Sequence, residues 1–180
     1  DVYKRQGLPT GYSIVEGGVV AESEKGNSSV LNILPVTLGI MLLLLMLQLR
    51  RYSRMLLALF MAPFGLPGIV MAMLPGDTPM GFVALLGVIA LAGMIIRNAV
   101  ILITEVDGNQ AQGMESDAAI ITAAEHRARP IFLTACAAIL GMVPISHQVF
   151  WGPMAYAIIG GLIVATLVTV TVLPASFSLL

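Results

Sequence analysis

One arginine lies inside an apolar segment that is long enough to cross a membrane. Arg97 interrupts the run from Phe82 to Ile103, where it keeps its charge because arginine stays protonated in proteins. A charge at the centre of a spanning helix costs roughly 2.5 to 3.5 kcal/mol on insertion scales, so it should face protein or water and be paired there. All acidic residues of the chain lie outside its apolar runs. We therefore expect the acidic partner of Arg97 to come from sequence that this chain lacks.

Small residues share the helix face of Arg97. The residues that fall within about a 60° arc of that face are Ala90, Gly93, Arg97 and Thr104. Small side chains allow a second helix to come close. In the alternative interpretation, the guanidinium extends to the membrane surface, since Arg97 lies roughly 9 Å from the inner edge of the segment. A lipid-facing arginine has no need of small neighbours, so the stripe favours a packed position.

A similar stripe occurs in the next apolar segment if its helix extends back through Arg127. One side of that helix would then carry Arg127, Thr134, Ala138 and Gly141, with Arg129 nearly opposite. Arg127 could point into a bundle while Arg129 points to lipid headgroups. Taken alone, both are typical of an ordinary cytoplasmic boundary, and the Thr134 hydroxyl is typical of one bonded to its own helix.

The composition is that of a membrane protein. Hydrophobic residues make up 58% of the chain and charged residues only 11%, whereas soluble domains have about 25% charged residues. A net charge of -1 argues against a nucleic-acid partner. One cysteine and two separated histidines give no pattern for a metal site, and we expect no cofactor.

Five membrane spans are predicted, at about 31–49, 55–74, 82–104, 127–146 and 153–176, which gives an all-α bundle in a lipid bilayer. A cytoplasmic amphipathic helix is predicted at about 116–127, with Ser116 as its N-cap. Arginines at 50, 51 and 54 place the first loop in the cytoplasm. Alternation then places residues 105–129 inside, and residues 75–79 and the chain before Leu31 outside.

The segment 7–30 differs in kind from the spans. Tyr12 to Val15, followed by Gly17 and Gly18, predicts a short strand and turn, and Ala21 to Val30 a polar lead-in to the first span. A lone strand is not stable by itself, so this β remnant should be the end of a larger extracytoplasmic domain. Residues 1–6 are charged, and both ends of the chain look like cuts; we expect 1–6 to be a cloning or assembly scar.

Several segments together resemble one transporter family. GMIIRNAVILITE, followed after a loop by AAEHRARPIFLTACAAILGMVPI, resembles the tenth and eleventh transmembrane helices of the resistance-nodulation-division (RND) transporters, in the hydrophobe/amphiphile efflux branch of Gram-negative bacteria. LPTGYSIVEGG resembles the end of the periplasmic porter region, and MAPFGLPGIV the ninth helix. The resemblance covers nearly everything from Gly7 to Leu180, corresponding to the end of the porter region and helices eight to twelve.

The resemblance implies a proton-driven antiporter, not an enzyme, that exports drugs or other amphiphilic organic compounds across the bacterial inner membrane. In this family an aspartate pair on the fourth helix takes up protons, and basic residues on helices ten and eleven respond. The matching proton-relay residues here are Arg97, Asn98, Arg127 and Thr134, with Arg97 where the best-known members have lysine. Because the heavy-metal branch is expected to carry an acidic group near this position, Arg97 favours an organic substrate.

Partners are also implied by the resemblance. They are the missing N-terminal half with its acidic pair, further copies in a homotrimer, a periplasmic membrane-fusion protein and an outer-membrane channel. Two other classes stay open. A protein-export subunit of the same superfamily should carry its own motifs in place of RNAVILI and RARPIFLT, and a membrane scaffold without transport would need no buried charge.

Overall fold

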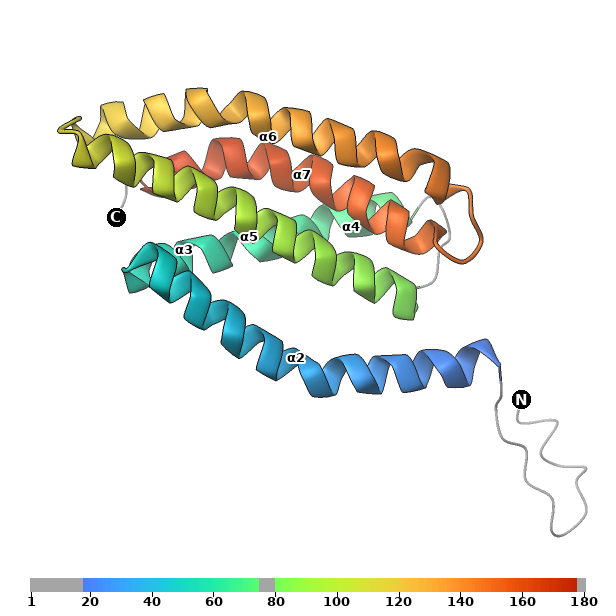
Figure 1. The fold of residues 1–180 in the computed structure, drawn as a ribbon. Helices are drawn as coiled ribbons and strands as arrows, with labels where there is room; N and C mark the ends of the chain where they lie inside the picture. Colours follow the sequence, from blue (N-terminus) through green and yellow to red (C-terminus); the bar gives the residue numbers. More distant parts are fainter. Residues whose placement is uncertain (1–17, 75–79, 178–180) are drawn as a thin grey trace, which may run out of the picture.

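The computed structural model describes residues 18–74 and 80–177, and this part of the chain is all-helical (Figure 1). Five of its helical stretches are long and apolar enough to cross a membrane: Ala21–Leu49, Tyr52–Met73, Phe82–Ala111, Ser116–Ser146 and Gly152–Phe177. The predicted all-α fold with five spans is therefore confirmed for the described residues. The predicted scar at 1–6, the strand at 12–15 and the loop at 75–79 lie outside them.

Helix α7 (Gly152–Phe177) lies at the centre of the bundle. It packs against α4 (Leu66–Met73), α5 (Phe82–Ala111) and α6 (Ser116–Ser146). Helix α2 (Val19–Leu49) lies at the edge, where it contacts α3 (Tyr52–Met61) and α5. Only 6% of its most apolar stretch is buried, so most of α2 is not covered by the other described helices.

Glycines bring α4 and α7 into backbone contact. A Cβ atom at Gly68 would overlap the carbonyl oxygen of Gly160, and a Cβ at Gly160 would overlap the carbonyl oxygen of Gly68. The next glycine, Gly161, makes room for Leu91 of α5, which is 1% exposed. Close backbone approach at small residues is the usual way in which membrane helices gain packing energy.

The second span contains a 3-10 turn that the sequence analysis did not predict. Between α3 and α4 the chain forms the 3-10 turn η1 (Ala62–Gly65), with Pro63 in its first turn and Pro67 in the first turn of α4. Proline has no N–H for the helical ladder and its ring disturbs the preceding turn, so two prolines four residues apart favour this break.

Several helices extend beyond the bounds predicted for the membrane spans. Helix α2 starts at Val19, so the polar lead-in from Ala21 to Val30 is helical, because nothing in it stops a helix after Gly18. Helix α5 runs on to Ala111. The amphipathic helix and the fourth span form the single helix α6, with Pro130 inside it; Glu115 is the N-cap and Ser116 the first helical residue.

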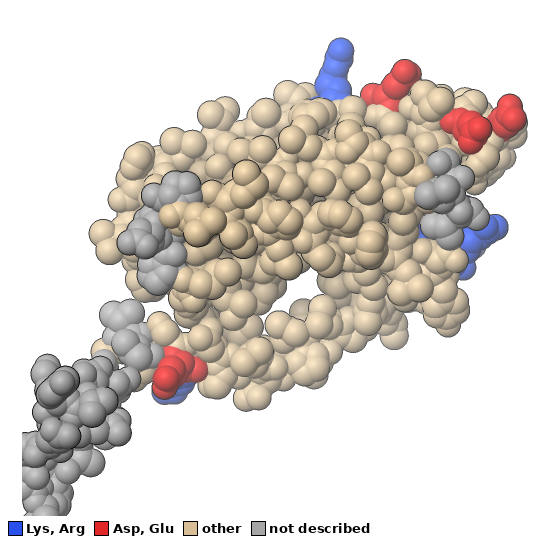
Figure 2. Space-filling view, turned by 180° about the vertical axis from the view of Figure 1, so that it is seen from behind, with Lys and Arg blue, Asp and Glu red and all other residues tan. Residues whose placement is uncertain are grey.

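The connections alternate between the two ends of the bundle. Figure 1 shows the α2–α3 and α5–α6 connections at the same end as the C-terminal end of α7, and the α6–α7 connection at the other end. Figure 2 shows that most of the visible charged side chains lie towards the ends, with a wide uncharged band between them. This is the pattern of a bundle that crosses a membrane; the side that each end faces stays a prediction.

Candidate functional site

Three of the four predicted relay residues line one cavity of about 210 Å³. Helix α5 contributes Arg97 and Asn98, and α6 contributes Thr134. The remaining lining is apolar and comes from Met94, Ala135, Ala138 and Leu162. The structure therefore brings the Thr134 hydroxyl to a cation and an amide that lie more than thirty residues earlier in the sequence.

Arg97 lies on a face of α5 that is left exposed by the other helices the structure describes. Its side chain is exposed, as are Ala90 and Gly93, and a Cβ atom at Gly93 would meet nothing within 4 Å. The opposite side of α5 is core, with Leu91 and Ile95 at 1% and 2% exposed. The stripe of small residues is therefore exposed, and none of the described helices packs on it.

Arg97 forms no ion pair with an acidic side chain in the part of the chain that the structure describes. The ion pairs found there join Arg54 to Asp107 and Arg127 to Glu105, and Nδ1 of His126 lies 3.9 Å from Oε1 of Glu105. Arg97 takes part in none of them. That its acidic partner belongs to sequence outside this chain stays a prediction.

Asn98 and Thr134 add two different hydrogen-bonding groups to the cavity. Asn98 is buried, at 7% exposed. The Thr134 hydroxyl donates to the carbonyl oxygens of Pro130 at 3.0 Å and Ile131 at 2.9 Å. Since a hydroxyl has only one hydrogen to donate, Thr134 can offer the cavity an acceptor, suited to a guanidinium or a water molecule.

Arg127 does not line this cavity. Its Nε donates to Oε2 of Glu105 at 3.0 Å, and its Nη2 contacts the same oxygen, so the pair joins α6 to α5. His126 lies beside it, with Nδ1 3.9 Å from Oε1 of Glu105. Sequence reasoning missed Glu105 as the partner; the available signal was that Glu105 follows one apolar run and Arg127 precedes the next.

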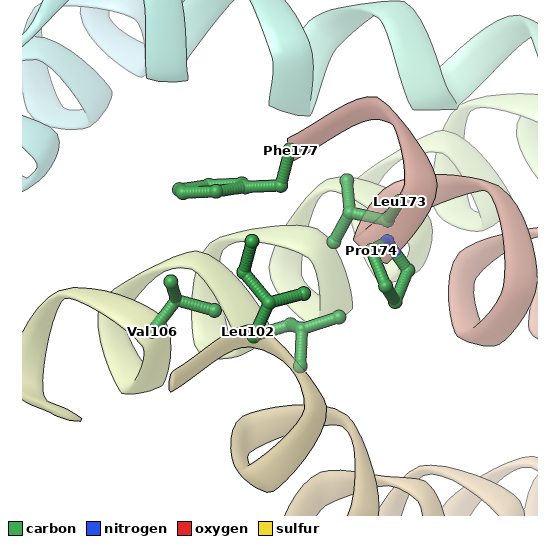
Figure 3. A pocket seen from close by; sticks show the side chains of 6 residues that line it. Leu102, Val106, Leu173, Pro174 and Phe177 are labelled. Atoms are coloured by element: carbon green, nitrogen blue, oxygen red, sulfur yellow. The ribbon is translucent and has the colours of Figure 1, made fainter. Parts of the chain in front are cut away.

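A second ion pair was also missed. Arg54, interpreted from sequence as a loop charge, pairs with Asp107 of α5, and its guanidinium carbon lies 5.7 Å from the centroid of the Phe177 ring. Figure 3 shows Phe177 and Leu173 of α7 beside Leu102 of α5, around a narrow apolar crevice. The end of the bundle that carries the α2–α3 turn is therefore fastened by charges on α3, α5 and α6.

The chemistry available to the cavity is electrostatic. An arginine will not release its proton near neutral pH, and neither an amide nor an alcohol titrates there. The site cannot carry a proton by itself, but a fixed cation responds strongly to a change of charge on a nearby acid.

Comparison with known proteins shows similarity to one family of transporters. A family model described as the AcrB/AcrD/AcrF family matches residues 1–180. Among curated proteins, the cobalt-zinc-cadmium resistance protein CzcA of Cupriavidus metallidurans is 29% identical over 96% of this chain and 17% of its own length. The nickel and cobalt resistance protein CnrA of the same organism is 32% identical over 97% of this chain and 17% of its length. The multidrug resistance protein MdtC of Erwinia amylovora is 28% identical over 93% of this chain and 17% of its length.

The fold matches a solved transporter. The crystal structure of a heavy metal efflux pump superposes with a TM-score of 0.77 at 26% identity, covering 99% of this chain and 18% of that one. The present chain therefore spans about a sixth of the proteins that it matches. The expected hydrophobe/amphiphile branch is not supported by these likenesses, because proteins named for metal resistance stand among the most similar.

Proposed function

The chain belongs to the AcrB/AcrD/AcrF family of RND transporters, and we propose that it supplies the basic half of the proton-coupling site of a secondary efflux transporter. The observation that carries the proposal is Arg97, a cation in a spanning helix, without an acidic partner among the described residues and beside a polar cavity. Such a charge is rare in membranes and marks a functional position by default.

Coupling follows from the charge on a neighbouring acidic pair. Two unit charges about 4 Å apart interact by about 4 kcal/mol at an effective dielectric constant of 20. Losing such an attraction on protonation changes a two-state equilibrium by about a thousandfold. Protonating aspartates that hold Arg97 would therefore release α5 and favour another packing of the bundle.

Arginine in place of lysine restricts how the site works. Because Arg97 does not titrate, it acts by changing partners rather than by giving up a proton. Thr134 and Asn98 line the same cavity, and the Thr134 oxygen offers an acceptor when the carboxylates are neutral. These two residues therefore provide the second binding position of the Arg97 guanidinium.

Arg127 has a different part in this proposal. Its charge is balanced by Glu105 of α5, and both side chains are partly exposed. It can transmit a movement of α5 to α6 through this ion pair. We therefore propose that Arg127 couples the movement of α5 to α6 and does not respond to protonation directly.

Two substrate classes have support. Arg97 is basic where a metal-exporting branch is expected to carry an acidic group, and one relative is named for multidrug resistance; this favours drugs or other amphiphilic organic compounds. Relatives named for cobalt, zinc, cadmium and nickel resistance support a divalent cation as the second candidate.

The whole transporter, expressed in a host strain without its own exporters, distinguishes these candidates. We expect it to lower cellular accumulation of a fluorescent amphiphilic dye but not of Co²⁺, and export of Co²⁺ alone would select the second candidate. Arg97→Ala should abolish export at normal abundance, and Arg97→Lys should retain part of it because the charge is restored. The control is Arg129→Ala, an exposed arginine of α6; equal export by Arg97→Ala and this control would remove Arg97 from coupling.

Location and assembly complete the proposal. We propose that the protein lies in the bacterial inner membrane with residues 7–30 in the periplasm, as a homotrimer with a membrane-fusion protein and an outer-membrane channel. Cysteines introduced at Gln112 and Gln148, in the Cys136→Ala background, should be labelled from the cytoplasmic and the periplasmic side respectively. Labelling of Gln112→Cys only from outside would reverse the topology.

A further inference from the structure

The two halves of the second span are attached to the bundle in different ways. Helix α4 is in backbone contact with α7 at Gly68 and Gly160, and its Ile69 side chain is 1% exposed. The first turn of α3 is far less enclosed: Tyr52 is 69% exposed, and the buried residues of this helix begin at Leu57. The α4 half is therefore fixed to α7 by close packing, whereas the first turn of α3 has little apolar packing to hold it.

The turn between these halves has the features of a hinge. Pro63 and Pro67 each lack the N–H that a helix needs, one in η1 and one at the start of α4, and a 3-10 turn within a helix often marks a hinge. A cavity of about 240 Å³ lies between this turn and α5, with Leu66, Val88 and Ala92 in its walls. The angle at η1 can therefore change without first displacing packed side chains on this side.

One side chain joins the first turn of α3 to two other helices. Arg54 forms an ion pair with Asp107 of α5, and its guanidinium carbon lies 5.7 Å from the centroid of the Phe177 ring of α7. The side chains of Arg54 and Asp107 are only 16% and 26% exposed, so solvent and salt screen their attraction less than at an open surface. Charge therefore supplies the attachment that apolar packing does not.

Asp107 can also receive a second cation. Its Oδ1 is buried and makes no hydrogen bond among the described residues, whereas its Oδ2 contacts Arg54. The exposed Arg51, which is the N-cap of α3, attracts the same carboxylate electrostatically. Asp107 is therefore the point on α5 to which the start of α3 is held.

We infer that Arg54 and Asp107 are positioning residues of the transport cycle, which make α3 follow a movement of α5 about the hinge at η1 while α4 stays on α7. Helix α5 contains no proline, and Asp107 lies ten residues, or about 15 Å, after Arg97 on it. A displacement of α5 at Arg97 therefore moves the Asp107 carboxylate, and the attraction to Arg54 moves the start of α3 with it. The inference rests on the proposed function for the movement of α5, whereas the attachment of α3 can be measured independently of it.

Distances between spin labels test this attachment in the whole transporter, reconstituted in nanodiscs with its native cysteines replaced. Labels at Leu56 and Gly108 follow α3 relative to α5, and labels at Met71 and Ile163 follow α4 relative to α7; all four positions are exposed. In Asp107→Asn we expect the first distance to lengthen and spread by roughly 2 Å or more, the scale of helix shifts between functional states. The second distance should not change.

Charge controls show whether the ion pair itself is responsible. Asp117→Asn removes an exposed charge of α6 and should leave both distances as in the wild-type protein. Arg54→Glu alone should lengthen the first distance, and Arg54→Glu combined with Asp107→Arg should restore it. Wild-type distances in both single variants would overturn the inference, and so would an equal change in the α4–α7 distance, which would show a general loosening of the bundle.

The wild-type protein provides a test that does not depend on how well these variants fold. Between a pH at which the coupling acids are ionised and one at which they are protonated, the distance from Leu56 to Gly108 should stay constant while that from Leu56 to Ile163 changes. A change in the first distance with the second constant would overturn the inference, because α5 would then move without α3. If neither distance changes, the movement of α5 that the proposed function requires is contradicted as well.

Dye export separates the positioning role from the coupling site. Asp107→Asn should lower kcat for export several-fold and leave KM unchanged, because the ion pair acts on the movement and not on substrate binding; wild-type kcat would contradict a role in transport. Arg97→Ala should abolish export and leave the distance between labels at Leu56 and Gly108 unchanged. Normal export by Arg97→Ala would count against the proposed function alone, whereas wild-type label distances in Asp107→Asn and Arg54→Glu would count against this inference alone.

Discussion

Two glycine-bearing helix surfaces of the same bundle differ in packing: one is in close contact with another helix and the other is exposed. At the α4–α7 contact, Gly68 and Gly160 bring two backbones together so closely that neither can carry a Cβ atom without overlap. On the outer face of α5, Gly93 lies beside Arg97 and meets nothing within 4 Å. Both surfaces have the small residues that close helix packing requires, but among the described residues only the first has a partner helix.

The difference between these two surfaces shows how much can be inferred from small residues on a helix face. They indicate that a helix can approach, and the α4–α7 contact shows such an approach completed. They do not say which segment supplies the second helix. The charge supplies that information on the α5 face, because Arg97 calls for an acidic neighbour and the described residues offer it none.

The largest effect is expected at the closed contact. Gly160→Leu would drive a side chain into Ala72 and the Gly68 carbonyl, and overpacking of this kind costs roughly 1 to 3 kcal/mol or more. We expect little folded protein, measured as abundance in the membrane and as resistance to unfolding in detergent. Gly39→Leu is the matched control, since a Cβ at Gly39 of α2 meets nothing within 4 Å. Normal stability of Gly160→Leu would show that the contact is not as close as described.

The open face gives the second prediction. If a helix from the rest of the transporter covers Gly93, then Gly93→Leu in the whole protein should block export, at a cost of roughly 1 to 3 kcal/mol. Thermal stability and dye efflux would be measured together, with Gly93→Ala as the milder partner. Full activity of Gly93→Leu would mean that lipid covers this face. The α5 face would then not be a helix-packing surface like the α4–α7 contact.

A smaller effect is expected for the ion pair between Glu105 and Arg127. Their side chains are 24% and 38% exposed, so solvent screens the attraction, and a double-mutant cycle should give a coupling energy of about 1 kcal/mol or less. The variants are Arg127→Ala, Glu105→Ala and the double variant, followed by unfolding in detergent. Arg127→Ala should retain more export than Arg97→Ala, because its charge is balanced within the chain. Equal loss of export in the two variants would place Arg127 beside Arg97 in the coupling step.

Sequence was sufficient to predict the five spans, whereas the function of the predicted relay residues stays a proposal. The apolar runs predicted five crossings, and helical spacing together with family resemblance selected Arg97, Asn98 and Thr134, which line one cavity. Each of these inferences depends on local order along the chain, where hydrophobic runs and helix periodicity are direct signals.

The features that sequence did not reveal depend on packing or on distant residues. One such feature is the 3-10 turn at Pro63, and another is the single helix formed by residues 116–146. Both depend on how the neighbouring helices accommodate a proline. The pairing of Glu105 with Arg127 needs two helices brought side by side. Substrate class was also beyond reach, because the relay motif resembles one branch of the family while the relatives include proteins named for metal resistance.

The central claim is that Arg97 forms an ion pair with an acidic group from outside this chain. A cryo-EM structure of the whole transporter in a lipid nanodisc, prepared at a pH well above the pKa of the acidic group, would measure the distance from its guanidinium to the nearest carboxylate. We predict a carboxylate of another transmembrane helix within about 4 Å, the range in which opposite charges stabilise one another, with that helix packed on Gly93. An Arg97 guanidinium at the lipid headgroups, with no carboxylate near it and lipid against Gly93, would contradict the claim.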